Sequence, residues 1–169
     1  MAESFFELSI QDRQMVLDIA VRSSGRPPIF IEKDIWVVWC IQKLFETAIG
    51  ERLLFKGGTS LAKICLWLIE RFSEDVDLAR DMRDLVPELA NIEQDWLLLS
   101  HAKIKELSRM ARAQLKSWVA ETVFPFLKQE LEKIEPLGKI RLSERTIFIH
   151  YPSVVPLSDY IMPSVKLEF

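Results

Sequence analysis

Two aspartates separated by one residue are the feature of this sequence that points most directly to chemistry. Asp75 and Asp77 lie in the stretch 73–80, where apolar and polar residues alternate. Residues i and i+2 of a strand point to the same face, so their Cα atoms would lie roughly 6.5–7 Å apart. Two such carboxylates can bind one divalent cation, or two cations about 3.5–4 Å apart. The pattern predicts a Mg²⁺ or Mn²⁺ site; the alternative is a solvated strand face.

A pair of glycines precedes these aspartates. Gly57 and Gly58 are two of only five glycines, and they stand between an apolar run and a helical pattern. Backbone N–H groups at the start of a helix bind anions, because they lack intrahelical partners and lie at the positive end of the helix dipole. Thr59 and Ser60 add hydroxyl groups. The segment predicts a triphosphate-binding turn; the alternative is a helix start where glycine permits tight packing.

The two features are expected to meet in space. A helix of about twelve residues between them would bring the aspartate strand back beside the strand that precedes Gly57. Both functional ends would then lie at one edge of a sheet. A nucleoside triphosphate (NTP) with its Mg²⁺ is the ligand that fits both.

Three flanking polar residues could also contact the nucleotide. Arg71 and Ser73 precede the aspartates, and Lys63 lies in the intervening helix. A guanidinium suits phosphate recognition. The alternatives are a salt bridge from Arg71 to a neighbouring acidic residue and a solvated Lys63.

The composition is that of an ordinary globular domain. The net charge is −3, with 49% apolar and 28% charged residues, which excludes a strongly basic nucleic-acid-binding protein. Cys40 and Cys65 fall in apolar helical patterns and are expected to be buried free thiols. The start of the chain does not resemble a signal peptide, and no apolar run is long enough to span a membrane. A cytoplasmic location is therefore expected.

One segment is locally basic. The stretch 101–118 could contact the phosphates of an RNA, or it could be a solvated helix face. Its basic residues are His101, Lys103, Lys105, Arg109, Arg112 and Lys116.

The periodicity of the chain predicts an α+β fold with a central mixed sheet flanked by helices and a helical N-terminal region. A capping box at Ser4 starts a helix that runs to about Arg22, and a second helix ends with Gly50 as its C-cap. Further on, Pro125 interrupts a helical region. We expect one domain, 1–169, with parts 1–50 (helical), 51–80 (glycine and aspartate core), 84–135 (helical) and 139–169 (strands). The aromatic residues predicted in the core are Trp36, Trp39, Phe45, Trp67 and Phe72.

Two segments together resemble a known family. The sequence FKGGTSLAK at 55–63, followed by RFSEDVDL at 71–78, resembles the AbiEii/AbiGii toxin family of nucleotidyltransferases, in the DNA polymerase β-like superfamily. Residues 32–36 and 165–169 resemble other segments of that family. The resemblance spans about 30–169.

The resemblance implies a polymerase β-like fold and transfer of a nucleotide from an NTP to RNA, transfer RNA included, or to protein. It also implies a cognate antitoxin. Gly57, Gly58 and Ser60 would hold the triphosphate, with Thr59 beside them. Asp75 and Asp77 would bind Mg²⁺, and Glu168 would be a third carboxylate or else an exposed strand residue. The family also uses a lysine and an acidic residue further towards the C-terminus, so we expect the chain to lack a C-terminal portion.

Two other functions use the same residues. One is a catalytically incomplete module of the same fold that binds nucleotide or a protein partner. The other is a metal-dependent phosphohydrolase, in which water replaces the acceptor.

Overall fold

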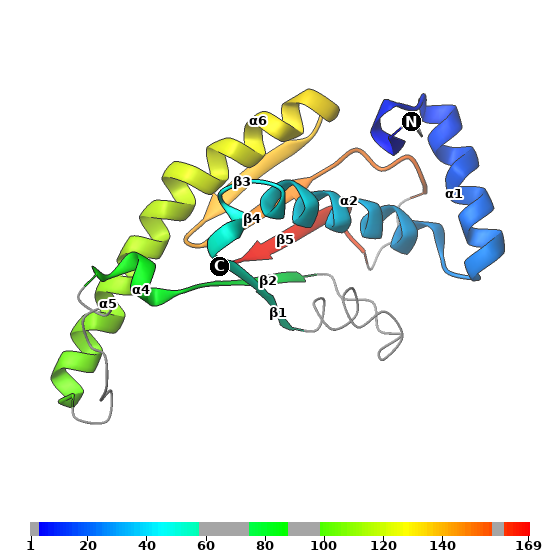
Figure 1. The fold of residues 1–169 in the computed structure, drawn as a ribbon. Coiled ribbons are helices and arrows are strands. Elements are labelled where there is room, and N and C mark those ends of the chain that lie inside the picture. The colour runs from blue at the N-terminus through cyan, green and yellow to red at the C-terminus, as the bar shows by residue number, and fades with distance from the viewer. Residues whose placement is uncertain (1–3, 58–74, 88–98, 157–160) are drawn as a thin grey trace.

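The computed structural model describes residues 4–57, 75–87, 99–156 and 161–169. Figure 1 shows how the elements are arranged. The helical elements are η1 (Phe5–Glu7), α1 (Ile10–Ser24), α2 (Pro28–Phe45), η2 (Gly50–Arg52), α4 (Met82–Leu85), α5 (His101–Trp118), η5 (Val119–Val123) and α6 (Phe124–Ile134). The strands are β1 (Leu53–Lys56), β2 (Asp75–Arg80), β3 (Lys139–Ser143), β4 (Thr146–His150) and β5 (Ser164–Glu168).

The five strands form one mixed sheet in the order β1-β2-β5-β4-β3. β2 pairs antiparallel with β1 and parallel with β5. The β3–β4 and β4–β5 pairs are antiparallel. The fold is therefore α+β with a mixed sheet, as the periodicity predicts. β2 is an interior strand of this sheet, between β1 and β5.

One face of the sheet forms the hydrophobic core. Val76, Leu78, Val165 and Leu167 alternate along β2 and β5 and are at most 1% exposed. Helices α2 and α6 contribute buried residues to the same cluster, and α2 crosses the sheet (Figure 1). The residues between these apolar positions must point to the other face, because side chains alternate along a strand.

The N-terminal helices differ in detail from the sequence prediction. Ser4 and Glu7 form the predicted capping box, but it starts only η1, and α1 begins at Ile10. Helix α2 ends at Phe45, so Gly50 is not its C-cap and instead begins η2. A Cβ on Gly50 would lie 2.5 Å from the Cα of Phe45, so a close backbone contact explains this glycine. The Phe45 side chain is 38% exposed and is not a core residue.

Pro125 does not end the helix in which it lies. Helices α5 and α6 are joined through η5, a π-helical segment whose last bond runs from the Phe124 N–H to the Val119 carbonyl. A π turn widens the helix, and it accommodates the missing N–H and the bulk of the proline ring that follows. The predicted helical region is therefore continuous from His101 to Ile134.

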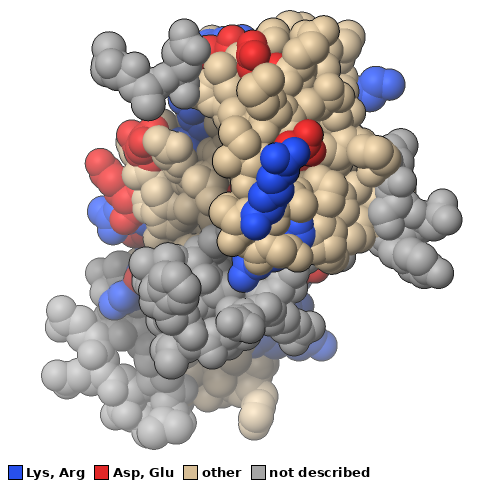
Figure 2. Space-filling view, turned by 90° about the vertical axis from the view of Figure 1, so that its right-hand side faces the viewer, with Lys and Arg blue, Asp and Glu red and all other residues tan. Residues whose placement is uncertain are grey.

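Helix α1 exposes several large apolar side chains. Ile10, Met15 and Ile19 of this helix are 61–62% exposed. On the face seen in Figure 2, the described charged side chains are scattered among uncharged atoms. Within the described ranges, no helix combines the length and hydropathy that crossing a membrane requires.

Candidate functional site

The two aspartates lie on the face of the sheet that turns away from the helical core. Asp75 and Asp77 are partly exposed, whereas Val76 between them is fully buried. This alternation fixes both carboxylates on the open face. The structure therefore places the pair as the strand pattern predicts.

Gly57 lies directly against Asp77. It follows β1 and has a φ of +76°, a conformation that L-residues with a Cβ rarely adopt. A Cβ at this position would lie 2.1 Å from Asp77 Oδ2 and 2.9 Å from its Cγ. Any other residue here would have to displace this carboxylate. The glycine turn and the aspartate strand therefore meet at one corner of the sheet.

Glu168 lies beside this corner on the next strand. In the parallel pair, Asp77 is opposite Glu168 and Asp75 is opposite Lys166. Cross-strand partners share a face, so Glu168 and Lys166 extend the polar surface of β2 onto β5. The structure thus brings together Gly57, Asp75, Asp77 and Glu168.

Lys166 is the residue of this site that sequence reasoning missed. Its Nζ lies 3.3 Å from Asp75 Oδ2 and also bonds Glu168 Oε1. The hydrogen bond with Glu168, supported by Asp75, raises the pKa of Lys166, so its ammonium group stays charged at neutral pH. The signal was present in the sequence: Lys166 and Glu168 are i and i+2 of one strand and must share a face.

The chemistry of these side chains fits a divalent cation, although they do not form a complete set of metal ligands. Within the described residues, no three acidic, histidine or cysteine side chains are gathered closely enough to hold a metal ion. Asp75 and Glu168 nevertheless already share one cation, the Lys166 ammonium. Mg²⁺ commonly takes one or two carboxylates and completes its shell with water and substrate phosphates. An incomplete carboxylate set of this kind fits a metal that arrives with a nucleotide.

Several predicted site residues lie outside the described residues. They are Gly58, Thr59, Ser60, Lys63, Arg71 and Ser73, and their roles stay predictions. Cys65, Trp67 and Phe72 also lie outside them.

Other side chains singled out from the sequence are described. Lys56 is exposed and opposite Asp77 in the register of β1 and β2. Trp36, Trp39 and Cys40 are buried, as predicted, and burial raises the pKa of the Cys40 thiol.

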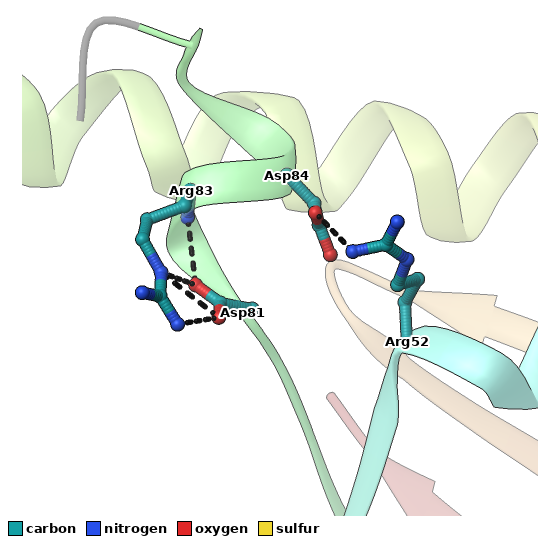
Figure 3. A network of polar contacts seen from close by, with 4 residues as sticks. All are labelled: Arg52, Asp81, Arg83 and Asp84. Atoms are coloured by element: carbon teal, nitrogen blue, oxygen red, sulfur yellow. Dashed lines mark hydrogen bonds and ion pairs between the residues drawn. The ribbon is translucent and has the colours of Figure 1, made fainter. Parts of the chain in front are cut away.

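The far end of the β1–β2 pair is held by an ionic network (Figure 3). Arg52 Nη1, just before β1, lies 3.0 Å from Asp84 Oδ1 in α4. Asp81 accepts hydrogen bonds from the backbone N–H and the guanidinium of Arg83, and the guanidinium hydrogen bond is the main cause that lowers the pKa of Asp81 to about 2. These exposed pairs lie at the opposite end of the strands from Gly57, so they stabilise the β1–β2 pair there rather than the candidate site.

The comparison with known proteins agrees with this geometry. No curated protein and no solved structure matches the chain. A family model described as "Nucleotidyl transferase AbiEii toxin, Type IV TA system" matches residues 41–169. That range includes the glycine turn, the aspartate strand and β5, whereas residues 32–36 lie before it. The chain therefore belongs to the AbiEii family of nucleotidyl transferase toxins of Type IV toxin–antitoxin systems.

Proposed function

We propose that this protein is a magnesium-dependent nucleotidyltransferase that moves a nucleoside monophosphate from an NTP to an RNA acceptor. It would act as the toxin of a toxin–antitoxin pair in the cytoplasm, with a cognate antitoxin as its partner. One observation carries the proposal: the Asp77 carboxylate lies directly against Gly57 at the turn, and Glu168 lies opposite Asp77 on β5.

The residues divide the work of binding and proton transfer. Asp75, Asp77 and Glu168 would hold the metal, with phosphate oxygens of the NTP completing its shell. When bound, Mg²⁺ neutralises charge on the phosphates and on the leaving pyrophosphate. An acceptor hydroxyl oxygen forms a bond to the α-phosphorus as the bond to the bridging oxygen breaks, and pyrophosphate leaves. The hydroxyl proton passes to a carboxylate, Asp77 or Glu168.

A basic stripe on α5 favours RNA over protein as the acceptor. At about 100° per residue, His101, Lys105, Arg109, Arg112 and Lys116 fall within an arc of about 80° and span roughly 22 Å. All five are exposed. Within the described residues, Lys105, Arg109 and Arg112 have no ion-pair partner, whereas Lys116 pairs with Glu144. Unpaired, aligned cations are what a phosphate backbone binds.

The C-terminal end of α5 packs against the sheet. Trp118 is the last residue of α5, and its ring packs edge-on against Phe169, with centroids 6.1 Å apart. Phe169 directly follows Glu168. The Arg80 guanidinium, at the end of β2, lies 4.0 Å from the Trp118 ring centroid. These contacts fix the C-terminal end of α5 against β2 and β5, on the face of the sheet opposite the carboxylates.

The direct test is a labelling assay. The protein is incubated with Mg²⁺, each α-labelled NTP in turn, and total RNA or total protein. We expect labelled RNA and released pyrophosphate. Asp75→Asn and Asp77→Asn should each reduce labelling at least about 100-fold, because each removes a charged metal ligand. Asp18→Asn is the matched control, since Asp18 is an exposed aspartate of α1, and it should behave like the unaltered protein.

Each product identifies a different function. Labelled protein would replace the RNA acceptor by a protein acceptor. Free nucleotide or phosphate without labelled macromolecule would indicate the phosphohydrolase. Nucleotide binding without any product would indicate a binding module and would contradict the transferase.

A further inference from the structure

Lys166 lies where a metal ion would have to bind. Its ammonium group contacts Asp75 on β2 and Glu168 on its own strand. The three side chains are about equally accessible, at 35%, 46% and 42% exposed for Lys166, Asp75 and Glu168. A divalent ion needs the same carboxylate oxygens, so the ammonium group and the metal compete for them.

Asp77 is oriented differently from its two neighbours. Its carboxylate lies against the Gly57 backbone, and within the described residues no salt bridge joins it to Lys166. The acidic groups are therefore divided between the glycine turn and the lysine. Bringing them onto one ion requires the Lys166 ammonium to move.

We propose that Lys166 is a built-in counter-ion that keeps the divalent-cation site closed until an NTP arrives. The inference rests on the proposed function, because it needs a triphosphate at the glycine turn. A bound triphosphate offers oxygens to the ammonium group, which can follow them on its flexible four-carbon stem. That movement frees Asp75 and Glu168 for the metal. Lys166 is thus a positioning residue that couples metal binding to nucleotide binding.

Removing the Lys166 charge should change the two affinities in opposite directions. The metal alone should bind more tightly, because its competitor is gone. The nucleotide should bind more weakly, because it loses a phosphate partner. A lysine that only supported the structure would, when removed, weaken both.

The experiment measures the two affinities separately in the full chain. Mn²⁺ alone is titrated and followed by electron paramagnetic resonance. A non-transferable α,β-methylene NTP is titrated in excess Mg²⁺ by calorimetry. For Lys166→Met we expect Mn²⁺ to bind about tenfold more tightly, from the loss of one adjacent like charge at an accessible site, and the nucleotide to bind several-fold more weakly.

Two variants are the controls. Lys166→Arg keeps the charge and should hold Mn²⁺ as weakly as the unaltered protein. Lys139→Met removes an exposed lysine of β3, on the same face of the sheet by the strand register, and should change neither affinity. Lys166→Gln repeats the charge loss with a polar side chain if the methionine variant does not fold.

Equal Mn²⁺ affinity in the unaltered protein and in Lys166→Met or Lys166→Gln would overturn the counter-ion role, and so would the absence of Mn²⁺ binding in both. Weaker binding of both ligands would also overturn it. The labelling assay reports on the proposed function separately. Labelled RNA with unchanged Mn²⁺ affinity removes only the role of Lys166, whereas tighter Mn²⁺ binding without any labelled product removes only the transferase.

Discussion

Two glycines of this chain share a backbone conformation but not an environment, and that difference isolates the role of Gly57. Gly25 has a φ of +68° and Gly57 a φ of +76°. A Cβ on Gly25 would contact nothing within 4 Å, whereas one on Gly57 would meet the Asp77 carboxylate. An alanine would therefore have a strained backbone at both positions, but its Cβ would collide with another side chain only at position 57.

The first prediction follows from that comparison. Gly25→Ala should lower the free energy of unfolding by about 1–2 kcal/mol, the cost of a left-handed alanine. Gly57→Ala should cost more than this and should also reduce nucleotide transfer, because Asp77 must move. Urea denaturation and the labelling assay measure the two effects. Full activity in Gly57→Ala would show that the position of Asp77 against the turn is unimportant.

A buried glutamate outside the site makes stability depend on pH. Glu32 of α2 is 1% exposed. Its carboxylate accepts hydrogen bonds from the Ser153 hydroxyl (2.6 Å) and the Val154 N–H (2.7 Å). Burial outweighs these bonds and raises the pKa of Glu32. The folded protein therefore holds this proton at pH values where the unfolded chain has released it.

The second prediction is the direction in which the contribution of Glu32 to stability changes with pH. Because the pKa is raised on folding, the contribution of Glu32 to stability is fully present at low pH. It falls as pH rises through and above the ordinary titration range of a glutamate, near about pH 4.3. Glu32→Gln cannot ionise, so it should gain stability relative to the unaltered protein between about pH 4 and 7. Urea midpoints across that range test this, and a constant difference between the two proteins would contradict it.

At the level of the strand, the alternation of β5 separates folding from function. Leu167 is fully buried in the core, whereas Lys166 faces the open side. Leu167→Ala should lower the free energy of unfolding by about 2–5 kcal/mol, from lost burial and the cavity left behind. Lys166→Met should cost less than about 1 kcal/mol, as exposed ion pairs contribute little. Urea denaturation compares them, and equal losses would contradict the assignment of the two faces.

Local patterns predicted the strands well and the long-range contacts poorly. Alternating residues placed β2 to within two residues, and the region predicted to form strands, 139–169, contains β3, β4 and β5. Gly50 was assigned wrongly because its close contact with the Phe45 backbone depends on how the chain turns after α2. The pairing of Lys166 with Asp75 joins residues 91 positions apart. No local period encodes such a register, so the contact of Lys166 with Asp75 could not be predicted, whereas the face that Lys166 shares with Glu168 could have been.

At the level of the whole molecule, the arrangement of charge matters more than its sum. The net charge is −3, yet α5 carries cations aligned along one side. Recognition of RNA by such a stripe depends on counter-ions released from the phosphates, and therefore on salt.

The corresponding prediction concerns RNA affinity. Lys105→Gln, Arg109→Gln and Arg112→Gln together should weaken RNA binding and lower the slope of log affinity against log salt by about two, at about 0.7 per cation. The matched triple is Lys103→Gln, Lys128→Gln and Lys133→Gln, which removes three cations already paired with glutamates. Fluorescence anisotropy in a salt series measures both. Similar slopes for the two triples would place the RNA elsewhere.

The parallel pairing of β2 with β5 also decides when the site can exist. The chain leaves the ribosome from its N-terminus, so Asp75 and Asp77 emerge long before the strand that carries Glu168. Until then, β2 has only β1 beside it, and Val76 and Leu78 lack their parallel neighbour. Under the proposed function, a toxin still being translated lacks the complete set of carboxylates, and the cell that makes it is not exposed to activity from unfinished chains.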